Sequence, residues 1–505
     1  MTSSENTEHK KSNKKSKTGT SHKTGKKRAL FRKNLHGIAA VLSLVQALTA
    51  AVFIYLLNGT GMIPWKYIMI AFAVQAVLVL IAVVLTGIKH RNARIAAVFL
   101  SIFVISVQVV GSSYLYRTMN LLRSSESSYK TDLLDIVVRT DDPAQEIRDI
   151  GDYSFGIVDD LSKVERETLE QSIRFKVGKE VTFKDYSTAA EVVKALFDRE
   201  VDAAVYSDAY SPILAEVLDS FSAGVRVLDT HEIRTEMAYE AVEPGEPFHL
   251  LISGIDVKGD ISQASRSDVN IIVTINPKTK KILMTSTPRD FYVEIPGISE
   301  GQRDKLTHAG IYGEDASIAT LEQLYGINIT NYVRVNFTTL IEIVDAIDGV
   351  DVWSDYEFEC FTDPEVYINK GMNHLNGRQA LAFCRERFSF PDGDNQRGRD
   401  QEAVLKAILE KVMSPALIVN ASGLIESMEG SFQTDLPETK IAELINQQLS
   451  EGTDWLILRQ AAASGPSGMK YTYSAGMASV TEPDMYSIKK NSARMQMILE
   501  ERPQN

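Results

Sequence analysis

The sequence predicts a membrane-anchored α/β protein, and three observations support this fold class. Close to the N-terminus, three uncharged apolar runs follow one another, each about 20 residues long and sufficient to cross a bilayer. Short apolar runs then alternate with helical ones, and further on buried strands end in polar residues. We therefore expect three transmembrane helices, a small α/β accessory domain and an α/β/α sandwich with a central mixed sheet.

The chain is too long for one hydrophobic core. It has 505 residues, and cores of soluble domains stop growing well below that length. Composition and patterning predict four segments: a disordered basic tail, a membrane region, an accessory domain and a catalytic domain. Their predicted boundaries are residues 1–35, 36–116, 117–243 and 244–502.

The charge is unevenly distributed along the chain. The net formal charge is -12, yet residues 1–33 contain 11 Lys and Arg against two Glu. A basic tail ahead of an acidic body is typical of membrane topology, so no nucleic-acid partner is expected.

The predicted membrane spans are Ile38–Leu57, Tyr67–Ile88 and Ile95–Tyr116. The loop Lys89–Arg94 between the second and third spans carries three basic residues and a His. Because basic loops stay in the cytoplasm, the N-terminus should lie inside and everything after Arg117 outside. We expect a multi-pass protein of the cell membrane whose spans serve as an anchor and contact membrane lipid.

The accessory domain shows strands alternating with helices. Strands are expected at residues 154–158, 181–183, 203–206 and 225–228, and helices at 163–177, 189–198 and 211–220. No glycine-rich phosphate loop follows any of these strands. The role of this domain stays open, with ligand sensing as one possibility.

In the catalytic domain, polar residues gather at the predicted ends of strands. Strands are expected at 249–255, 269–275 and 282–286, and helices at 317–325, 337–347 and 375–386. Asp256, Arg266, Asp268, Arg289 and Asp290 all lie at or beside the strand ends. Open α/β sheets bind ligands at such ends, so these residues are candidates for a site.

A second polar set lies in the stretch FCRERFSFPDGDNQRGRDQ, residues 383–401. It holds Arg385, Arg387, Arg397 and Arg399, with Asp392 and Asp394 between them and Asp400 directly after Arg399. Arginine grips phosphate in a planar, bidentate manner, so the stretch predicts a clamp for a polyanion; the alternative is a solvated ion-pair surface.

Two arginines separated by one residue cannot face the same ligand from one helix. The helix is therefore expected to end near Arg385, with Arg387 in an extended exit. In that exit Phe388 and Phe390 alternate and are candidates for covering the site or touching a lipid.

Several motifs together resemble the LytR-CpsA-Psr family. They are LLISGID, SRSDVNIIVTINPKTKKILMTSTPRD, DKLTHAG, INITNYVRVNFTTLIEIVDAIDGVDV, LNGRQALAFCRERFS, GDNQRGRDQ and MASVTEPDMYSIKKNSARMQMIL. The resemblance covers residues 247–500. The three spans and the accessory domain resemble the capsule-type branch of that family.

The resemblance implies an enzyme that moves an anionic glycopolymer, such as capsular polysaccharide or teichoic acid, from an undecaprenyl-diphosphate lipid to peptidoglycan outside the membrane. It implies Mg²⁺ or Mn²⁺ on two carboxylates and diphosphate on several arginines. The implied metal ligands are Asp256 and Asp268; the implied substrate contacts are Arg266, Arg289, Arg385, Arg387, Arg397, Asp394 and Gln401.

Roles in the implied reaction can be assigned to some of these residues. Arg289, Arg385 and Arg387 would stabilise the reacting phosphates, and Asp394, or alternatively Asp290, would accept the proton of the attacking hydroxyl. Where the family pattern calls for an Arg-Gln pair, this chain has Arg399-Asp400-Gln401, which puts the role of Arg399 in doubt. Polymer-synthesis proteins are possible partners.

The lipid chain requires an apolar slot. Candidates for lining it are residues 269–275 and 282–284 together with Leu340, Ile343 and Val344, although each of these would equally suit a core. The only two cysteines, Cys360 and Cys384, are candidates for a disulfide outside the cell.

Two alternatives to transfer remain from the sequence. Water in place of the acceptor hydroxyl would make the same site a polyprenyl-diphosphate pyrophosphatase. A membrane-bound regulator of envelope genes is the other alternative, although no DNA-binding motif is evident in the sequence.

Overall fold

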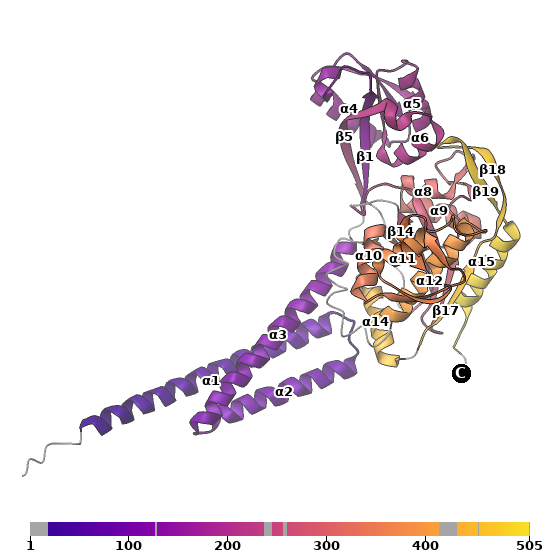
Figure 1. Ribbon diagram of the computed structural model, residues 1–505. Coiled ribbons are helices and arrows are strands. Elements are labelled where there is room, and N and C mark those ends of the chain that lie inside the picture. The colour runs from indigo at the N-terminus through magenta and orange to yellow at the C-terminus, as the bar shows by residue number, and fades with distance from the viewer. Residues whose placement is uncertain are drawn as a thin grey trace, which may run out of the picture. The chain divides into compact units, whose positions relative to one another are not determined.

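The computed structural model describes residues 19–126, 129–236, 245–255, 260–413, 432–452 and 454–503. The chain divides into two compact units, Met1–Arg117 and Thr118–Asn505. The first contains three long apolar helices, and the second contains a small mixed-sheet domain followed by a larger one (Figure 1). The predicted fold class is confirmed.

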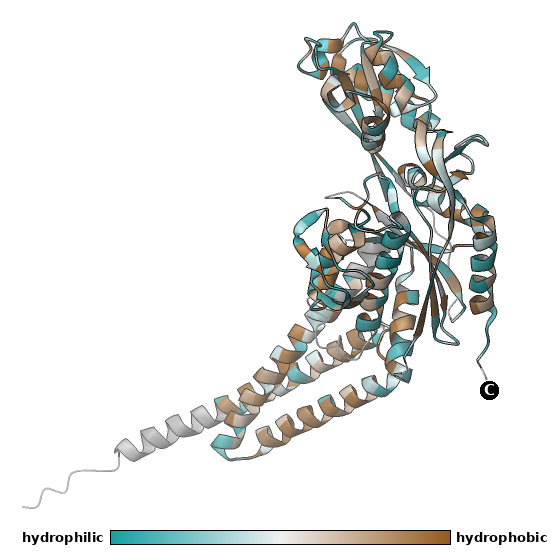
Figure 2. Cartoon of the chain, turned by 45° about the vertical axis from the view of Figure 1, so that its right-hand side comes forward, coloured by the Kyte–Doolittle hydropathy of each residue, from teal (hydrophilic) through white to brown (hydrophobic). Residues whose placement is uncertain are grey.

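The first unit consists of α1 (Gly19–Gly59), α2 (Trp65–Gly87) and most of α3 (Arg91–Glu126). Each helix contains a stretch long and apolar enough to cross a membrane, and these stretches are the brown helices of Figure 2. α1 begins at Gly19, within the segment for which the sequence predicts a disordered tail to residue 35. The Lys, Arg, Ala and Leu residues of this segment have high helix propensity.

Polar side chains join the three helices to one another. Gln46 of α1 accepts a hydrogen bond from Ser101 of α3 at 2.8 Å, and Gln108 of α3 donates to Gln75 of α2 at 2.7 Å. Thr49 of α1 donates to the side-chain oxygen of Gln108. Within lipid, such interhelical bonds stabilise one specific arrangement of helices. The spans therefore form a defined bundle rather than three independent anchors.

The accessory domain is a five-stranded mixed sheet in the order β3-β2-β4-β1-β5. Its strands are β1 (Tyr129–Arg139), β2 (Ser154–Val158), β3 (Thr182–Tyr186), β4 (Ala203–Ser207) and β5 (Val225–Glu236). Its helices are α4 (Lys163–Val177), α5 (Ala189–Phe197), α6 (Ser211–Val217) and α7 (Phe221–Gly224), with 3-10 turns η1 (Ile147–Ile150) and η2 (Asp208–Tyr210).

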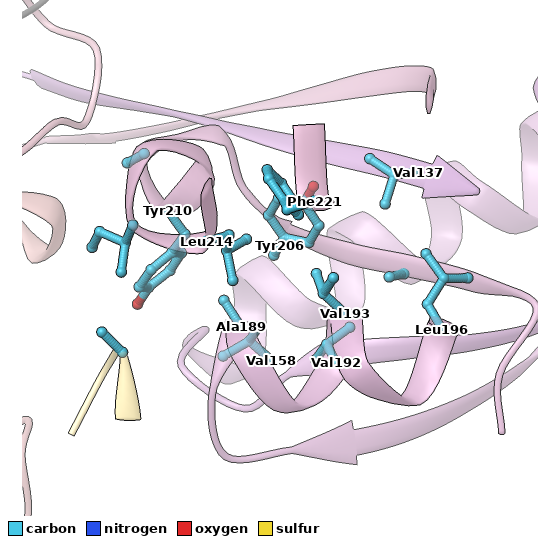
Figure 3. Close-up of a cluster of buried hydrophobic side chains, with 14 of the residues drawn as sticks. Val137, Val158, Ala189, Val192, Val193, Leu196, Tyr206, Tyr210, Leu214 and Phe221 are labelled. Carbon is cyan, nitrogen blue, oxygen red and sulfur yellow. The ribbon is translucent and has the colours of Figure 1, made fainter. Parts of the chain in front are cut away.

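Both faces of the accessory sheet are buried. Val192 and Leu196 of α5 pack with Val137 of β1 on one face, as Figure 3 shows, and α4 packs on the other. The bounds of β2 and α4 agree with those predicted from the sequence, whereas β1 was not predicted. Thr131 and Asp135 are buried in β1, and these inward polar residues break the apolar pattern that reveals a strand.

The larger domain contains a six-stranded mixed sheet in the order β16-β11-β6-β7-β8-β17. The strands are β6 (Phe248–Ile255), β7 (Ser267–Asn276), β8 (Lys281–Ser286), β11 (Asn331–Asn336), β16 (Phe432–Thr434) and β17 (Leu456–Ala461). The helices are α8 (Leu306–Tyr312), α9 (Glu314–Tyr325), α10 (Phe337–Ala346), α11 (Gly377–Arg385), α12 (Asp394–Val412), α14 (Glu438–Glu451) and α15 (Met485–Glu500).

Four two-stranded ribbons complete the domain. They are β9 (Tyr292–Glu294) with β10 (Arg303–Lys305), β12 (Val350–Ser354) with β15 (Gly371–Leu375), β13 (Phe358–Cys360) with β14 (Asp363–Ile368), and β18 (Ser464–Thr472) with β19 (Gly476–Pro483). Residues of β12 to β15 pack with α11 and α12 in one separate core.

Alternate residues of the central strands face opposite layers. Leu251, Ile272 and Leu283 pack with residues of α9 and α15, whereas Ile271 and Met284 pack with residues of α12 and α14. The sheet is thus sandwiched between helices, as predicted. Residues 282–284 and Val344, which were predicted to line a lipid slot, belong to these cores and do not line the pocket described below.

The predicted Cys360–Cys384 disulfide is not present. Both cysteines are free and buried in the core formed by β12 to β15, α11 and α12. Burial raises the pKa of Cys360 to about 12, and it also raises the pKa of Cys384. Both thiols are therefore shielded and protonated at neutral pH.

We expect neither cysteine to react with iodoacetamide in the folded protein, because reaction requires an accessible thiolate. Intact mass should be unchanged by reduction, and both residues should become alkylated only after denaturation. A loss of two mass units in the untreated protein, restored by reduction, would contradict the structure.

Candidate active site

A β-bulge places Asp268 at the edge of the sheet. Gly254 of β6 pairs with Val269 of β7, but the next residue, Ile255, pairs with Ser267, so Asp268 is the extra residue. A Cβ at Gly254 would lie 2.7 Å from the side chain of Val269, so the glycine permits this close pairing. Bulges redirect side chains and are frequent beside active sites.

Asp268 lies within a cluster of positive charge. Its carboxylate accepts a hydrogen bond from Arg289 at 2.7 Å and another from Thr307 at 3.1 Å. Burial opposes ionisation of Asp268, but Arg289, Arg266 and Arg397 outweigh it, and the pKa of Asp268 lies below its ordinary value. Asp268 is therefore a carboxylate at any physiological pH.

Arg266 lies close enough to Asp268 to lower its pKa, but its side chain turns toward the accessory domain. Its guanidinium pairs with Glu216 of α6 at 3.2 Å. The adjoining loop is tied to the same domain, because Thr131 of β1 exchanges backbone hydrogen bonds with Ser262 and Ala264. The accessory domain thus contacts the segment that leads into β7.

Arg385 and Arg387 both line the candidate pocket. Asn376 caps the start of α11 by accepting the backbone N–H of Gln379, and the helix ends at Arg385. Glu386 is extended, with φ -67° and ψ 135°. This confirms the prediction that the helix ends near Arg385, and the change of geometry lets both arginines reach one pocket.

Arg397 and Gln401 lie one turn apart on α12 and line the same pocket. Gln401 also donates to the carbonyl of Cys384 at 3.2 Å, which joins α12 to the last turn of α11. Arg399 instead pairs with Asp392 at 2.6 Å, outside the lining of the pocket. Its position two residues from Arg397 explains the difference, because it projects from another side of the helix.

The pocket has a volume of about 280 Å³ and two chemically different parts. Six of the predicted residues contribute the polar part: Asp268, Arg289, Arg385, Arg387, Arg397 and Gln401. Much of the remainder is apolar and includes Ile252, Val269, Ile271, Leu340, Leu381, Val404, Leu405 and Ile408 of β6, β7, α10, α11 and α12. Such a composition suits an amphiphile with an anionic head and an apolar chain.

Some predicted residues lie elsewhere or outside the description. Asp256 follows the last residue of β6 and lies outside the described residues, as does the side chain of Asp394. Asp290, the alternative proton acceptor, pairs with Lys305 at 3.2 Å and does not line the pocket. Phe388 lines the pocket as predicted, but Phe390 is buried in the neighbouring core.

Asp268 has the ligand chemistry that a divalent cation requires. Within the described parts of the chain, no cluster of three or more acidic, His or Cys side chains exists, but Mg²⁺ commonly takes only one or two carboxylates and completes its shell with water and phosphate. Asp268 is ionised and lies in the pocket with the arginines. With Asp256 it would hold the ion, which when bound would neutralise phosphate charge.

Sequence reasoning missed Phe337, whose ring lies under the guanidinium of Arg385 at 4.3 Å from the ring centroid. The ring restrains the arginine by a cation–π contact. Phe337 begins α10, far from Arg385 in sequence, and only the packing of α10 on α11 brings them together. No local signal could have revealed this pair.

Asp400, which follows Arg399, is a buried carboxyl beside the site. Its Oδ1 accepts a hydrogen bond from Gln396 at 2.8 Å, and its Oδ2 has no hydrogen-bond partner among the described residues. Burial raises the pKa of Asp400 to about 7 and that of Glu402, on the same helix, to about 8. Between about pH 4 and pH 7, Asp400 and Glu402 therefore stay protonated in the folded protein, whereas both are ionised in the unfolded chain.

We expect Asp400→Asn to raise the thermal unfolding temperature more at pH 8 than at pH 5. A raised pKa in the folded state stabilises the protein below the unfolded pKa, and this stabilisation is lost as pH rises through about 7. Asparagine resembles the protonated form at every pH. Unfolding measured by calorimetry at both pH values tests this, and equal shifts at the two would contradict it.

Comparison with known proteins identifies the family of the chain. The sequence pattern of the LytR_cpsA_psr family matches residues 217–490, which is more than half of the chain. The chain therefore belongs to the LytR-CpsA-Psr family. The matched region contains the whole pocket, from β6 to α12.

Relatives include a polyisoprenyl-teichoic acid–peptidoglycan teichoic acid transferase TagU from Bacillus cereus (strain AH820). It is 35% identical over 206 residues, which are 41% of this chain and 66% of the relative. The protein of the same name from Enterococcus faecalis (strain ATCC 700802 / V583) is 36% identical over 194 residues, 38% of this chain and 62% of the relative. The chain thus spans just under two thirds of the length of these relatives.

Solved structures similar to the chain include TagV of B. subtilis, with a TM-score of 0.44 and 28% identity over 52% of this chain and 100% of TagV. Another is TagT bound to LI-WTA, with a TM-score of 0.42 and 27% identity over 52% of this chain and 94% of TagT.

Proposed function

We propose that this protein transfers an anionic glycopolymer from a polyprenyl-diphosphate lipid to peptidoglycan. The observation that carries the proposal is the two-part pocket, in which arginines and Asp268 adjoin an apolar cavity. A polyprenyl diphosphate has the same two parts. The names of the teichoic acid transferases among the relatives support this substrate class.

In the proposed reaction, a peptidoglycan hydroxyl attacks the phosphorus that carries the glycopolymer. The bond between this phosphorus and the bridging oxygen breaks, which leaves the polymer on peptidoglycan through a phosphodiester and releases polyprenyl monophosphate. Arg289, Arg385, Arg387 and Arg397 would stabilise the charge on both phosphates. Asp394 would accept the proton of the attacking hydroxyl, and Gln401 and Arg266 would contribute further contacts.

Teichoic acid is the polymer that the names of the relatives favour. Assignment to the capsule-type branch rests on the three helices and the accessory domain, and a capsular polysaccharide would fit the same pocket chemistry. Mg²⁺ or Mn²⁺ would bind Asp256 and Asp268. The membrane bundle would keep the pocket near its lipid substrate, and enzymes of polymer synthesis are candidate partners.

The proposal can be tested with the purified full-length protein in detergent or vesicles, a polyprenyl-diphosphate-linked glycopolymer, MgCl₂ and peptidoglycan oligomers. We expect equal amounts of polyprenyl monophosphate and polymer-linked peptidoglycan, both measured by mass spectrometry. Release of the monophosphate at the same rate without peptidoglycan would instead favour the pyrophosphatase. Absence of both products would overturn the proposed function.

The proposal also requires the pocket to lie outside the cell. We expect protease added to intact protoplasts to digest the residues after Arg117 and to spare the N-terminal tail, because the basic loop between the second and third helices favours the cytoplasm. Epitope tags at the two termini would report this by immunoblotting. Digestion of the C-terminal tag only after lysis would contradict the topology.

A further inference from the structure

Glu386 is a buried carboxylate that the proposed reaction does not use. Its exposed fraction is 0%, although it lies between two arginines that line the pocket. Acidic side chains are rarely buried to this extent unless they bind a partner. The groups that form hydrogen bonds with the Glu386 carboxylate therefore indicate its structural role.

One oxygen of Glu386 binds the segment that follows α11. Its Oε1 accepts backbone hydrogen bonds from Arg387 at 3.0 Å, Phe388 at 2.8 Å and Ser389 at 3.0 Å. Three successive N–H groups that converge on one oxygen form a nest, an arrangement that compensates a negative charge. The same three bonds restrain the backbone from which Arg387 and Phe388 project.

The other oxygen binds a second chain segment beside the pocket. Its Oε2 accepts the backbone N–H of Phe361 at 2.6 Å, in the turn between β13 and β14. The adjacent residue, Thr362, lines the pocket. The two segments also touch through side chains, because the ring centroids of Phe361 and Phe388 lie 4.6 Å apart. The guanidinium of Arg387 lies 4.6 Å from the ring centroid of Phe388.

We propose that Glu386 is a positioning residue that sets the direction of Arg387 and Phe388 in the lining of the pocket. It joins two chain segments through its two oxygens, and Arg387 is held between this restrained backbone and the Phe388 ring. Glu386 acts on the lipid diphosphate only through these neighbours. The inference rests on the proposed function, since it concerns the same ligand.

The first measurement does not depend on any ligand. Glu386→Gln keeps the size of the side chain, but whichever way its amide turns, its NH₂ group faces a backbone N–H on one of the two segments. Hydrogen exchange of the full-length protein should become faster at the amides of residues 387–389 or at Phe361. Unchanged exchange at all of these amides would overturn the proposal.

The second measurement is a double-mutant cycle on binding of a polyprenyl diphosphate in detergent micelles. Glu386→Gln should lower affinity about tenfold in the natural protein and less than about twofold when Arg387 is already Ala. A purely structural role predicts the same loss in both backgrounds. Equal losses, or no loss in a folded Glu386→Gln protein, would overturn the proposal.

Asp345→Asn provides the matched control. Asp345 accepts the backbone N–H of Gly377 at 2.7 Å, at the other end of α11 and away from the pocket lining. This variant should lower thermal stability without changing affinity. Failure of the unmodified protein to bind the probe would count against the proposed function, whereas binding that Glu386→Gln leaves unchanged would count against the positioning role alone.

Discussion

Replacement of Arg385 by Lys should weaken binding of a polyprenyl diphosphate about tenfold or more, although the charge is kept. A charge-assisted hydrogen bond contributes about 1.5–3 kcal/mol, and Lys cannot make the paired bonds of a guanidinium. Among the described residues, none forms a hydrogen bond or an ion pair with the guanidinium of Arg385. This guanidinium lies over the Phe337 ring in the pocket. It is therefore oriented and available for an anion.

Arg399→Lys is the control for this substitution. Arg399 belongs to the same stretch of sequence but pairs with Asp392 and lies outside the pocket lining. Isothermal titration in detergent would compare the two variants with the unmodified protein. If Arg385→Lys and Arg399→Lys bound the polyprenyl diphosphate with equal affinity, the arginines would form a solvated ion-pair surface. The hypothesis that they clamp the diphosphate would then be rejected.

Asp268→Asn should reduce transfer by roughly a hundredfold or more. Removal of one charge from a buried, hydrogen-bonded pair costs about 2–5 kcal/mol, and Arg289 loses its carboxylate partner at 2.7 Å. The proposed metal would lose a ligand as well. The effect is measured as release of polyprenyl monophosphate over a range of Mg²⁺ concentrations. Full activity of Asp268→Asn would show that neither the metal site nor the orientation of Arg289 for transfer depends on Asp268.

The same substitution should change acid stability in a defined direction. The pKa of Asp268 is lowered on folding, so its contribution is present above the unfolded pKa of about 4 and lost as pH falls through the folded value. Asp268→Asn should therefore be less stable at pH 7 and lose less stability on acidification. Asp141→Asn, which removes an exposed partner of Arg199 in the accessory domain, should leave transfer unchanged.

The elements of the fold could be predicted where one periodicity holds along a segment. β2, α4 and the end of α11 follow from local apolar spacing and from the two arginines that must share a ligand. β1 could not be predicted in this way, because buried polar residues interrupt its pattern. The cysteines were misjudged because a predicted location outside the cell would permit a disulfide but does not bring two thiols together.

The composition of the site could be predicted better than its arrangement. A charge run identifies arginines suited to phosphate, but helix phase decides that Arg397 lines the pocket and Arg399 does not. Glu386 has the same sequence signature as an exposed acidic residue, and only the converging backbone N–H groups explain its burial. Contacts between segments distant in sequence, such as Phe337 with Arg385, leave no local trace.

The extra residue in β7 makes the site sensitive to chain length. Gly254 and Ile255 are adjacent in β6, but their partners in β7, Val269 and Ser267, are separated by Asp268. Asp268 therefore has no partner in β6. A single-residue deletion at this point would restore continuous pairing, with no residue left to project from the break. Side chains around the pocket can therefore be exchanged without a change of register, whereas an insertion or deletion at the start of β7 would move Asp268 out of the pocket.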